Sequence, residues 1–149
     1  MTSWDITSVT SSSIQKTCCH CNKNIDVLIT ASVAGSSFRL RFNGANTYYL
    51  LHSITMAKET TAPSYDANTL VAVSVGGVGG TSQITISSNS QVWSDWITYN
   101  VQANTRYIVS FFHVCGPDYY SQWSTSSAYS WVDGSSKNYI YDIDRLEVQ

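Results

Sequence analysis

Apolar and polar residues alternate with a period of two along most of this chain. Successive side chains of a β-strand point to opposite faces, so the pattern predicts strands with one buried face. It is clearest at residues 38–42, where two phenylalanines and a leucine alternate with two arginines. Similar runs occupy residues 25–33, 71–75, 97–101 and 106–114. No stretch shows a sustained 3.6-residue period, so the sequence predicts an all-β protein.

Turn-forming residues separate the predicted strands, at 43–44, 76–77, 79–80 and 133–134 among other places. Many short strands with frequent turns are typical of two antiparallel sheets packed face to face. The chain has no internal repeat and no linker-like segment. We therefore predict one domain over residues 1–149, folded as a two-sheet antiparallel β-sandwich of jelly-roll-like type.

The composition excludes some classes of partner. Charged residues make up 12% of the chain and the formal net charge is −2. Nucleic-acid binding relies on clustered Lys and Arg, so no nucleic-acid partner is expected. No stretch approaches the ~20 apolar residues of a membrane-spanning helix, so no membrane association is expected. The first residues do not look like a signal peptide, which leaves either cytoplasmic synthesis or an upstream leader that has been removed.

The order of motifs in the middle of the chain follows a family pattern. The motifs are FRLRF, an Asn-Gly turn, LLHSITMAKE, LVAVSVGGVGG, ITISSNSQVWSDWITYNV and RYIVSFFH. This order resembles the β-sandwich accessory domain of SGNH/GDSL-type carbohydrate esterases, and similar modules of phage tail proteins. The resemblance covers residues 25–114, and implies a sandwich core with a non-catalytic role. Residues 1–24, an N-terminal strand with a Cys-rich segment, and residues 115–149, an aromatic loop with a closing strand, lie outside it.

No catalytic arrangement is evident in the sequence. The Gly-Asp-Ser nucleophile motif of the esterases does not occur, and neither does a G-x-S-x-G elbow. His113 extends a predicted strand, so its ring is expected at the rim of a sheet. Asp95 is expected to cap loop amides. Asp142 and Asp144 are expected to be solvated carboxylates on one side of a strand, with a hard-cation site that includes Asp118 as the alternative. We predict neither an enzyme nor a cofactor.

The segment TCCHCNKN at residues 17–24 leaves three interpretations open. A zinc site is one, with Cys18, Cys21, His113 and Cys115 as candidate ligands. A disulfide from Cys115 to Cys18, Cys19 or Cys21 is another, if the compartment is oxidising. Free, partly buried thiols are the third, which we prefer. Cys18 and Cys19 are adjacent and would point to opposite faces of a strand, which argues against a compact metal site.

Large aromatic residues in polar segments are the strongest sign of a binding surface. Flat rings supply apolar area and a polar tip at a small cost in rotamer entropy, and they can stack on the C–H faces of sugars. Alternatively, the rings cover an open sheet edge or pack against a second copy of the chain. The predicted ligand-binding residues are Trp93, Trp96, Tyr119, Tyr120, Trp123 and Trp131.

Together these patterns predict a non-catalytic attachment module that binds a glycan or neighbouring virion proteins. One setting is a phage-like virion, in which the chain would be a decoration, tail or receptor-binding protein made in the cytoplasm. The alternative is a carbohydrate-binding module of a secreted polysaccharide-active enzyme. The two settings differ in assembly, because a virion component is expected to bury a large interface and a binding module to be monomeric.

Overall fold

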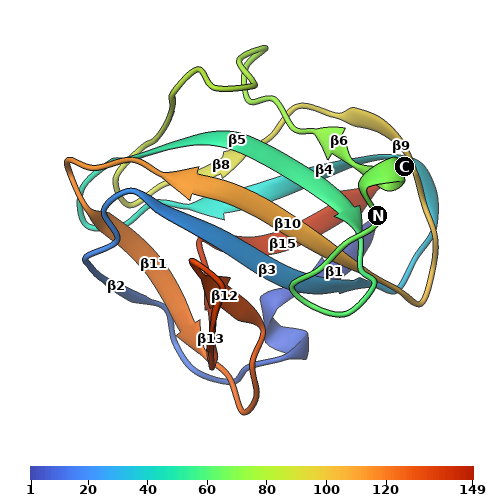
Figure 1. Ribbon diagram of the computed structural model, residues 1–149, viewed down its shortest axis with the longest axis horizontal. Helices are drawn as coiled ribbons and strands as arrows, with labels where there is room; N and C mark the ends of the chain where they lie inside the picture. Colours follow the sequence, from blue (N-terminus) through green and yellow to red (C-terminus); the bar gives the residue numbers. More distant parts are fainter.

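A computed structural model describes residues 1–149 as an all-β fold without α-helices (Figure 1). Two main sheets pack against each other, and every strand pair is antiparallel. This confirms the predicted antiparallel β-sandwich. The only helical segments are two short 3₁₀ turns, η1 (Ile6–Ser8) and η2 (Ala67–Thr69). Neither has the length or the apolar character needed to cross a membrane.

The strands form three sheets. The first has five strands, which are β1 (Thr2–Asp5), β15 (Ile143–Val148), β4 (Gly35–Asn43), β8 (Gln91–Trp93) and β9 (Ile97–Val101). The second has seven, which are β13 (Ser135–Lys137), β12 (Ser130–Val132), β3 (Lys23–Ala31), β10 (Thr105–His113), β5 (Tyr49–Lys58), β6 (Val71–Ala72) and β7 (Ile84–Ile86). A third, unpredicted sheet contains β14 (Tyr139–Tyr141), β11 (Tyr119–Ser124) and β2 (Gln15–Cys18).

The predicted alternation places the core between the two main sheets. Phe38, Leu40 and Phe42 on β4 are fully buried, and the arginines between them lie on the outer face. Burying one such apolar side chain stabilises the fold by about 1.5–3 kcal/mol. Strand β10 lies between β3 and β5, and it buries apolar side chains on both of its faces. One continuous apolar cluster joins residues from Trp4 to Val148, so both ends of the chain contribute to the same core.

The first and last strands lie side by side. Strand β1 pairs with β15, and the N-terminal ammonium of Met1 donates to the carbonyl oxygen of Val148 at 2.8 Å. Figure 1 shows the two chain ends close together at one end of the sandwich. The predicted closing strand therefore completes the five-stranded sheet next to the beginning of the chain.

Two predicted segments differ from the structure. The aromatic segment expected as a loop instead forms β11 and β12, which pair with β2 and β14 and with β3 and β13. The valine run predicted at 71–75 forms only a two-residue strand. Its continuation leaves β5 after a hydrogen bond from Val73 N to Ile54 O and turns back at Gly76–Gly77.

Candidate functional site

Strands β8 and β9 are two halves of one edge strand beside β4. Arg41 lies opposite Trp93, and Phe38 lies opposite Ile97. The stretch of β4 from Phe38 to Arg41 therefore lies opposite the stretch of the edge strand from Trp93 to Ile97, which is one residue longer. This extra residue is a β-bulge. Residues three apart in a regular strand point to opposite faces, but the bulge turns Trp96 to the same outer face as Trp93.

The bulge is held by the two residues between the tryptophans. Ser94 exchanges hydrogen bonds with Leu40, since its amide donates to Leu40 O at 2.8 Å and its hydroxyl accepts from Leu40 N at 2.9 Å. Asp95 leaves the sheet and accepts hydrogen bonds from the hydroxyl of Ser74 and from the amides of Gly76 and Gly77, at 2.7–3.1 Å. The Ser74 hydroxyl and these amides lower the pKa of Asp95. The predicted capping role of Asp95 is confirmed.

The guanidinium of Arg39 lies over both tryptophan rings. Its central carbon is 4.0 Å from the centroid of Trp93 and 4.8 Å from that of Trp96. Glu147 fixes the guanidinium, because its Oε1 accepts from Nε at 3.0 Å and from Nη2 at 2.7 Å. Trp96 is 39% exposed and Trp93 is half-buried. We call Arg39, Trp93 and Trp96 the Arg–Trp platform.

Three arginine–carboxylate pairs cross the same outer face. In addition to Arg39–Glu147, Arg41 binds Asp144 at 2.7 and 2.9 Å through two nitrogens. Arg145 binds Asp5 from the neighbouring strand at 2.9 and 3.1 Å. The hydrogen bonds that Arg41 donates to Asp144 are the main cause that raises the pKa of Arg41. Each cation has an anion beside it, so the face is neutral and its side chains are held in place.

The structure separates the predicted ligand-binding aromatics into two groups. Trp93 and Trp96 belong to the platform. Tyr120, Trp123 and Trp131 are only 8%, 6% and 9% exposed, so the expectation that they lie open in a loop is wrong. Each of their strands lies between two neighbouring strands. Tyr120 and Trp123 pack into the main core, and Trp131 packs on Leu28 and Ile108 on the other face of the seven-stranded sheet.

Tyr119 lies apart from both of these groups. It is 37% exposed on β11, where it pairs with Cys18 in the third sheet. It therefore presents an open aromatic ring outside the five-stranded sheet that carries the platform.

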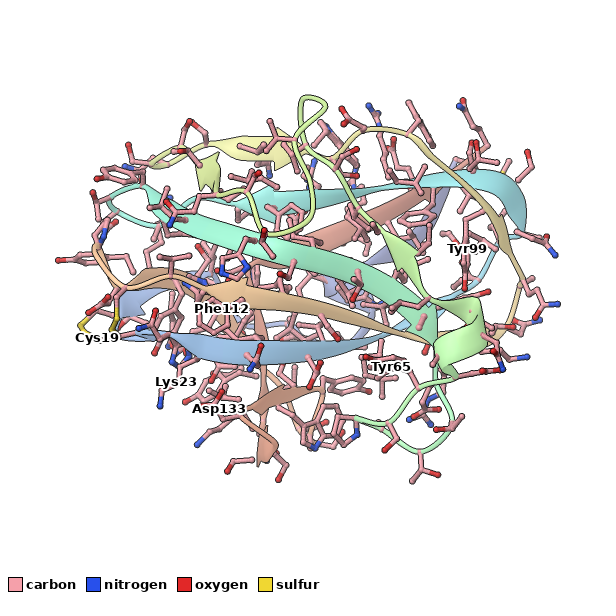
Figure 2. The ribbon with its side chains drawn as sticks, turned by 45° about the horizontal axis from the view of Figure 1, so that its top comes forward. Cys19, Lys23, Tyr65, Tyr99, Phe112 and Asp133 are labelled. Carbon is pink, nitrogen blue, oxygen red and sulfur yellow. A yellow bond between two sulfur atoms is a disulfide. The ribbon has the colours of Figure 1, made fainter.

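All four cysteines are paired. Cys21, just before β3, is bonded to Cys115, just after β10, and Cys18 is bonded to its neighbour Cys19. Figure 2 shows the sulfur–sulfur bonds beside Cys19 at one rim of the sandwich. The preferred prediction of free thiols is wrong, and the disulfide alternative is confirmed for Cys115 and Cys21. The same pairing removes Cys18, Cys21 and Cys115 as thiolate ligands for zinc.

His113 is fully buried, so the expectation of a rim position is wrong. Its Nε2 lies 2.7 Å from Oδ2 of Asp142, and the Ser121 amide donates to Oδ1 of that carboxylate at 2.9 Å. Tyr49 stacks on the imidazole at a centroid distance of 4.9 Å. The Ser121 hydroxyl donates to backbone carbonyl oxygens, at 3.2 Å each, and not to the ring. The pair therefore links the end of β10 to the junction of β14 and β15 inside the fold.

The expectation of two solvated aspartates on one side of a strand is also wrong. Asp142 is 0% exposed and Asp144 is 5% exposed. They turn to different partners, because Asp142 meets His113 inside the fold and Asp144 meets Arg41 on the outer face. Asp118 groups with the sulfurs of Cys21 and Cys115, and not with either of these carboxylates. The alternative of a shared hard-cation site is therefore not supported.

His20 makes the stability of the rim depend on pH. Its ring stacks on Tyr120 at 3.9 Å and lies 6.3 Å from the ring of His113, and its Nε2 is buried without a partner. Burial, and then repulsion from His113, lowers the pKa of His20 to about 4. An unfolded histidine titrates near pH 6.5, so the unfolded state binds more protons between these values. This contribution to stability is complete above pH ~6.5 and is lost as the pH falls to about 4.

We expect the free energy of unfolding to fall by about 1–2 kcal/mol more in the parent than in His20→Phe between pH 7 and pH 4. This range is smaller than the stability change that the whole pKa shift of His20 would give, because the side chain is partly exposed and solvent screens its charge. Phenylalanine keeps the stacking on Tyr120 and removes the titration. Urea unfolding at a series of pH values measures the difference. The same fall of the unfolding free energy with pH in the parent and in His20→Phe would contradict the prediction.

No family model matches this chain, and no curated protein is significantly similar to it. The resemblance to the esterase accessory domain and to phage tail modules therefore stays a prediction.

Proposed function

We propose that this chain is a non-catalytic attachment module that binds a carbohydrate on the Arg–Trp platform. The observation that carries the proposal is the bulge that places Trp93 and Trp96 on one open face beside Arg39. An exposed indole can stack on the C–H face of a sugar ring. The guanidinium N–H groups of Arg39 that do not bind Glu147 are available beside the rings for hydroxyl groups of the ligand.

The electrostatics of the face support a neutral, hydroxyl-rich ligand. Its three arginines are neutralised by Asp5, Asp144 and Glu147, so the face does not form the basic groove that single-stranded nucleic acid requires. The same ion pairs favour binding over glycoside hydrolysis. Glycoside hydrolysis needs two carboxyl groups that face the scissile bond, and each carboxylate of this face is instead held by an arginine.

The two disulfides help to identify the compartment in which the protein acts. Disulfides persist in secreted proteins and at cell and virion surfaces, where the environment is oxidising. This supports an extracellular place of action, and it favours the carbohydrate-binding module of a secreted protein over a component that stays in the cytoplasm. Light scattering distinguishes the settings, since a monomer fits the secreted module and a large assembly fits a virion attachment protein.

Affinity electrophoresis against a panel of neutral and acidic polysaccharides tests the proposal. At least one polysaccharide is expected to retard the parent protein. Trp96→Ala is expected to weaken that binding about tenfold or more, which corresponds to ~1.4 kcal/mol. Tyr119→Ala is the matched control, because its ring is about as exposed but lies outside the five-stranded sheet. Unretarded migration of the parent on every gel, or an equal loss in the control, would contradict the proposal.

A further inference from the structure

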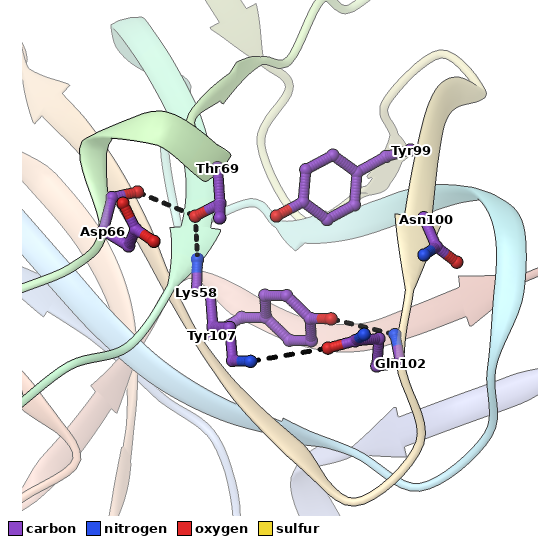
Figure 3. A pocket seen from close by; sticks show the side chains of 7 residues that line it. All are labelled: Lys58, Asp66, Thr69, Tyr99, Asn100, Gln102 and Tyr107. Carbon is purple, nitrogen blue, oxygen red and sulfur yellow. Dashed lines mark hydrogen bonds between the residues drawn. The ribbon is translucent and has the colours of Figure 1, made fainter.

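A groove of about 360 Å³ opens at the edge of the sandwich, between β9 of the first sheet and the η2–β5 corner of the second (Figure 3). Tyr99 forms one wall and packs edge-on against Phe38 and Tyr107 at centroid distances of 5.6 and 6.0 Å. Asn100 and Gln102 follow along the same strand and the turn after it. The groove is separate from the platform, because β9 turns Tyr99 toward the inside of the sandwich.

Hydrogen bonds within the protein fix the frame of this groove. The buried Tyr107 hydroxyl accepts from the amide of Gln102 at 2.9 Å. The Thr69 hydroxyl accepts from the amide of Lys58 at 2.8 Å and donates to the carbonyl oxygen of Asp66 at 2.7 Å. These bonds fix η2 to β5 and the turn after β9 to β10, so both sides of the groove are held in place before any ligand arrives.

Two opposite charges face the groove without pairing with each other. The ammonium of Lys58 has no carboxylate within 4 Å, and its one hydrogen bond is a long contact of 3.5 Å to Gln102 Oε1. The Asp66 carboxylate accepts only from the amide of Asn68 through Oδ1, at 3.0 Å. By contrast, every arginine of the chain is bound to a carboxylate. Lys58 and Asp66 therefore keep free hydrogen-bonding capacity on the η2–β5 side of the groove, across from Tyr99.

We propose that this groove binds a single uronate residue, that is, a pyranose ring with a carboxylate. The ligand carboxylate pairs with Lys58, ring hydroxyls donate to the free oxygen of Asp66, and the C–H face of the ring packs on Tyr99. The volume is at the lower end of the range for small-molecule sites, as one sugar ring requires. Burial raises the pKa of Tyr99, so its hydroxyl keeps its proton and can donate. Asp66 disfavours a more highly charged anion such as phosphate.

Titration of the ¹⁵N-labelled full chain with sodium D-galacturonate tests this site, with D-galactose and sodium acetate as comparison ligands. Galactose lacks the carboxylate, and acetate lacks the ring. Galacturonate is expected to shift the amide signals of Asn100 and Gln102 in a saturable way, with an affinity at least about fivefold above that of galactose. Acetate is expected to cause no saturable shift. Equal binding of galacturonate and galactose, or an acetate response that matches galacturonate, would overturn the assignment.

Lys58→Gln is the decisive variant, since Lys58 is exposed at the end of β5 and its side chain is not part of the core. It is expected to reduce galacturonate binding about tenfold, to the level of galactose. The matched control is Lys137→Gln on β13, another exposed strand lysine, which is expected to bind like the parent. Unchanged binding by Lys58→Gln would overturn the proposal.

The groove proposal does not depend on the platform, and one variant separates them. Trp96→Ala is expected to leave the galacturonate titration unchanged. A parent that binds galacturonate in the groove but no polysaccharide on the platform would retain this inference and reject the proposed function. Polysaccharide binding on the platform without galacturonate binding in the groove would retain the proposed function and reject this inference.

Discussion

A variant that carries Cys21→Ser and Cys115→Ser is expected to lose about 3–4 kcal/mol of unfolding free energy. The bond joins residues 94 positions apart, between the start of β3 and the end of β10. Without this bond, the unfolded chain gains the conformational entropy that the closed loop had removed. For a loop of 100 residues, this entropy corresponds to a stabilisation of up to ~4.7 kcal/mol by the disulfide. Measured effects of native disulfides are commonly a little smaller, which sets the expected value.

The second disulfide supplies an internal control for this experiment. Cys18 and Cys19 are neighbours, so their bond closes no loop of the chain. Cys18→Ser with Cys19→Ser is expected to change the unfolding free energy by less than about 1 kcal/mol, because the loop-entropy contribution is absent. Urea unfolding without reductant measures both double variants. Equal losses in the two would show that chain connectivity is not the source of the stabilisation.

Replacing Asp142 by alanine is expected to cost about 3–5 kcal/mol, because it removes the acceptor of two buried hydrogen bonds and places alanine at a positive φ. Two donors, the Nε2–H of His113 and the Ser121 amide, would be left buried without an acceptor. Asp142 also has a positive φ of 63°, a conformation that aspartate and asparagine tolerate better than alanine. Its backbone connects β4 and β11, since its carbonyl accepts from Asn43 and its amide donates to Ser121 O.

Asp142→Asn is the matched variant for this site. It keeps the shape and the preference for positive φ, and its amide oxygen can accept one of the two hydrogen bonds. We expect a loss of about 1–2 kcal/mol, clearly smaller than for alanine. Urea unfolding followed by tryptophan fluorescence measures both variants. If alanine and asparagine behaved alike, the hydrogen bonds of this carboxylate would not be the cause of its effect.

The parts of the fold that depend on neighbours in sequence are predictable from the sequence. The alternation at residues 38–42 and 97–101 predicts which side chains face the core, because the face of a strand residue follows from its position alone. Asp95 is predictable as a cap from its place before a strand, but the amides that it caps, those of Gly76 and Gly77, lie 19 and 18 positions earlier in the chain. Trp93 and Trp96 are identifiable as large rings in a polar segment.

The parts that depend on distant partners are not predictable in this way. The bulge between Trp93 and Trp96 exists only in the register of β8 and β9 against β4, which lies more than 50 positions earlier in the chain. Burial of His113 and Asp142 requires three sheets to meet at one point. Tyr120, Trp123 and Trp131 lie among serines and threonines, and the strands that cover them come from both ends of the chain.

The closeness of Met1 and Val148 has a consequence for how this domain can be carried. Any polypeptide attached before the first strand and any attached after the last would leave from one pole of the molecule (Figure 1). A host loop could therefore receive the whole domain without being stretched, in the way that domain insertions and circular permutations are tolerated when termini are close. The geometry suits a pendant unit that is inserted within a larger chain as well as one joined at its end.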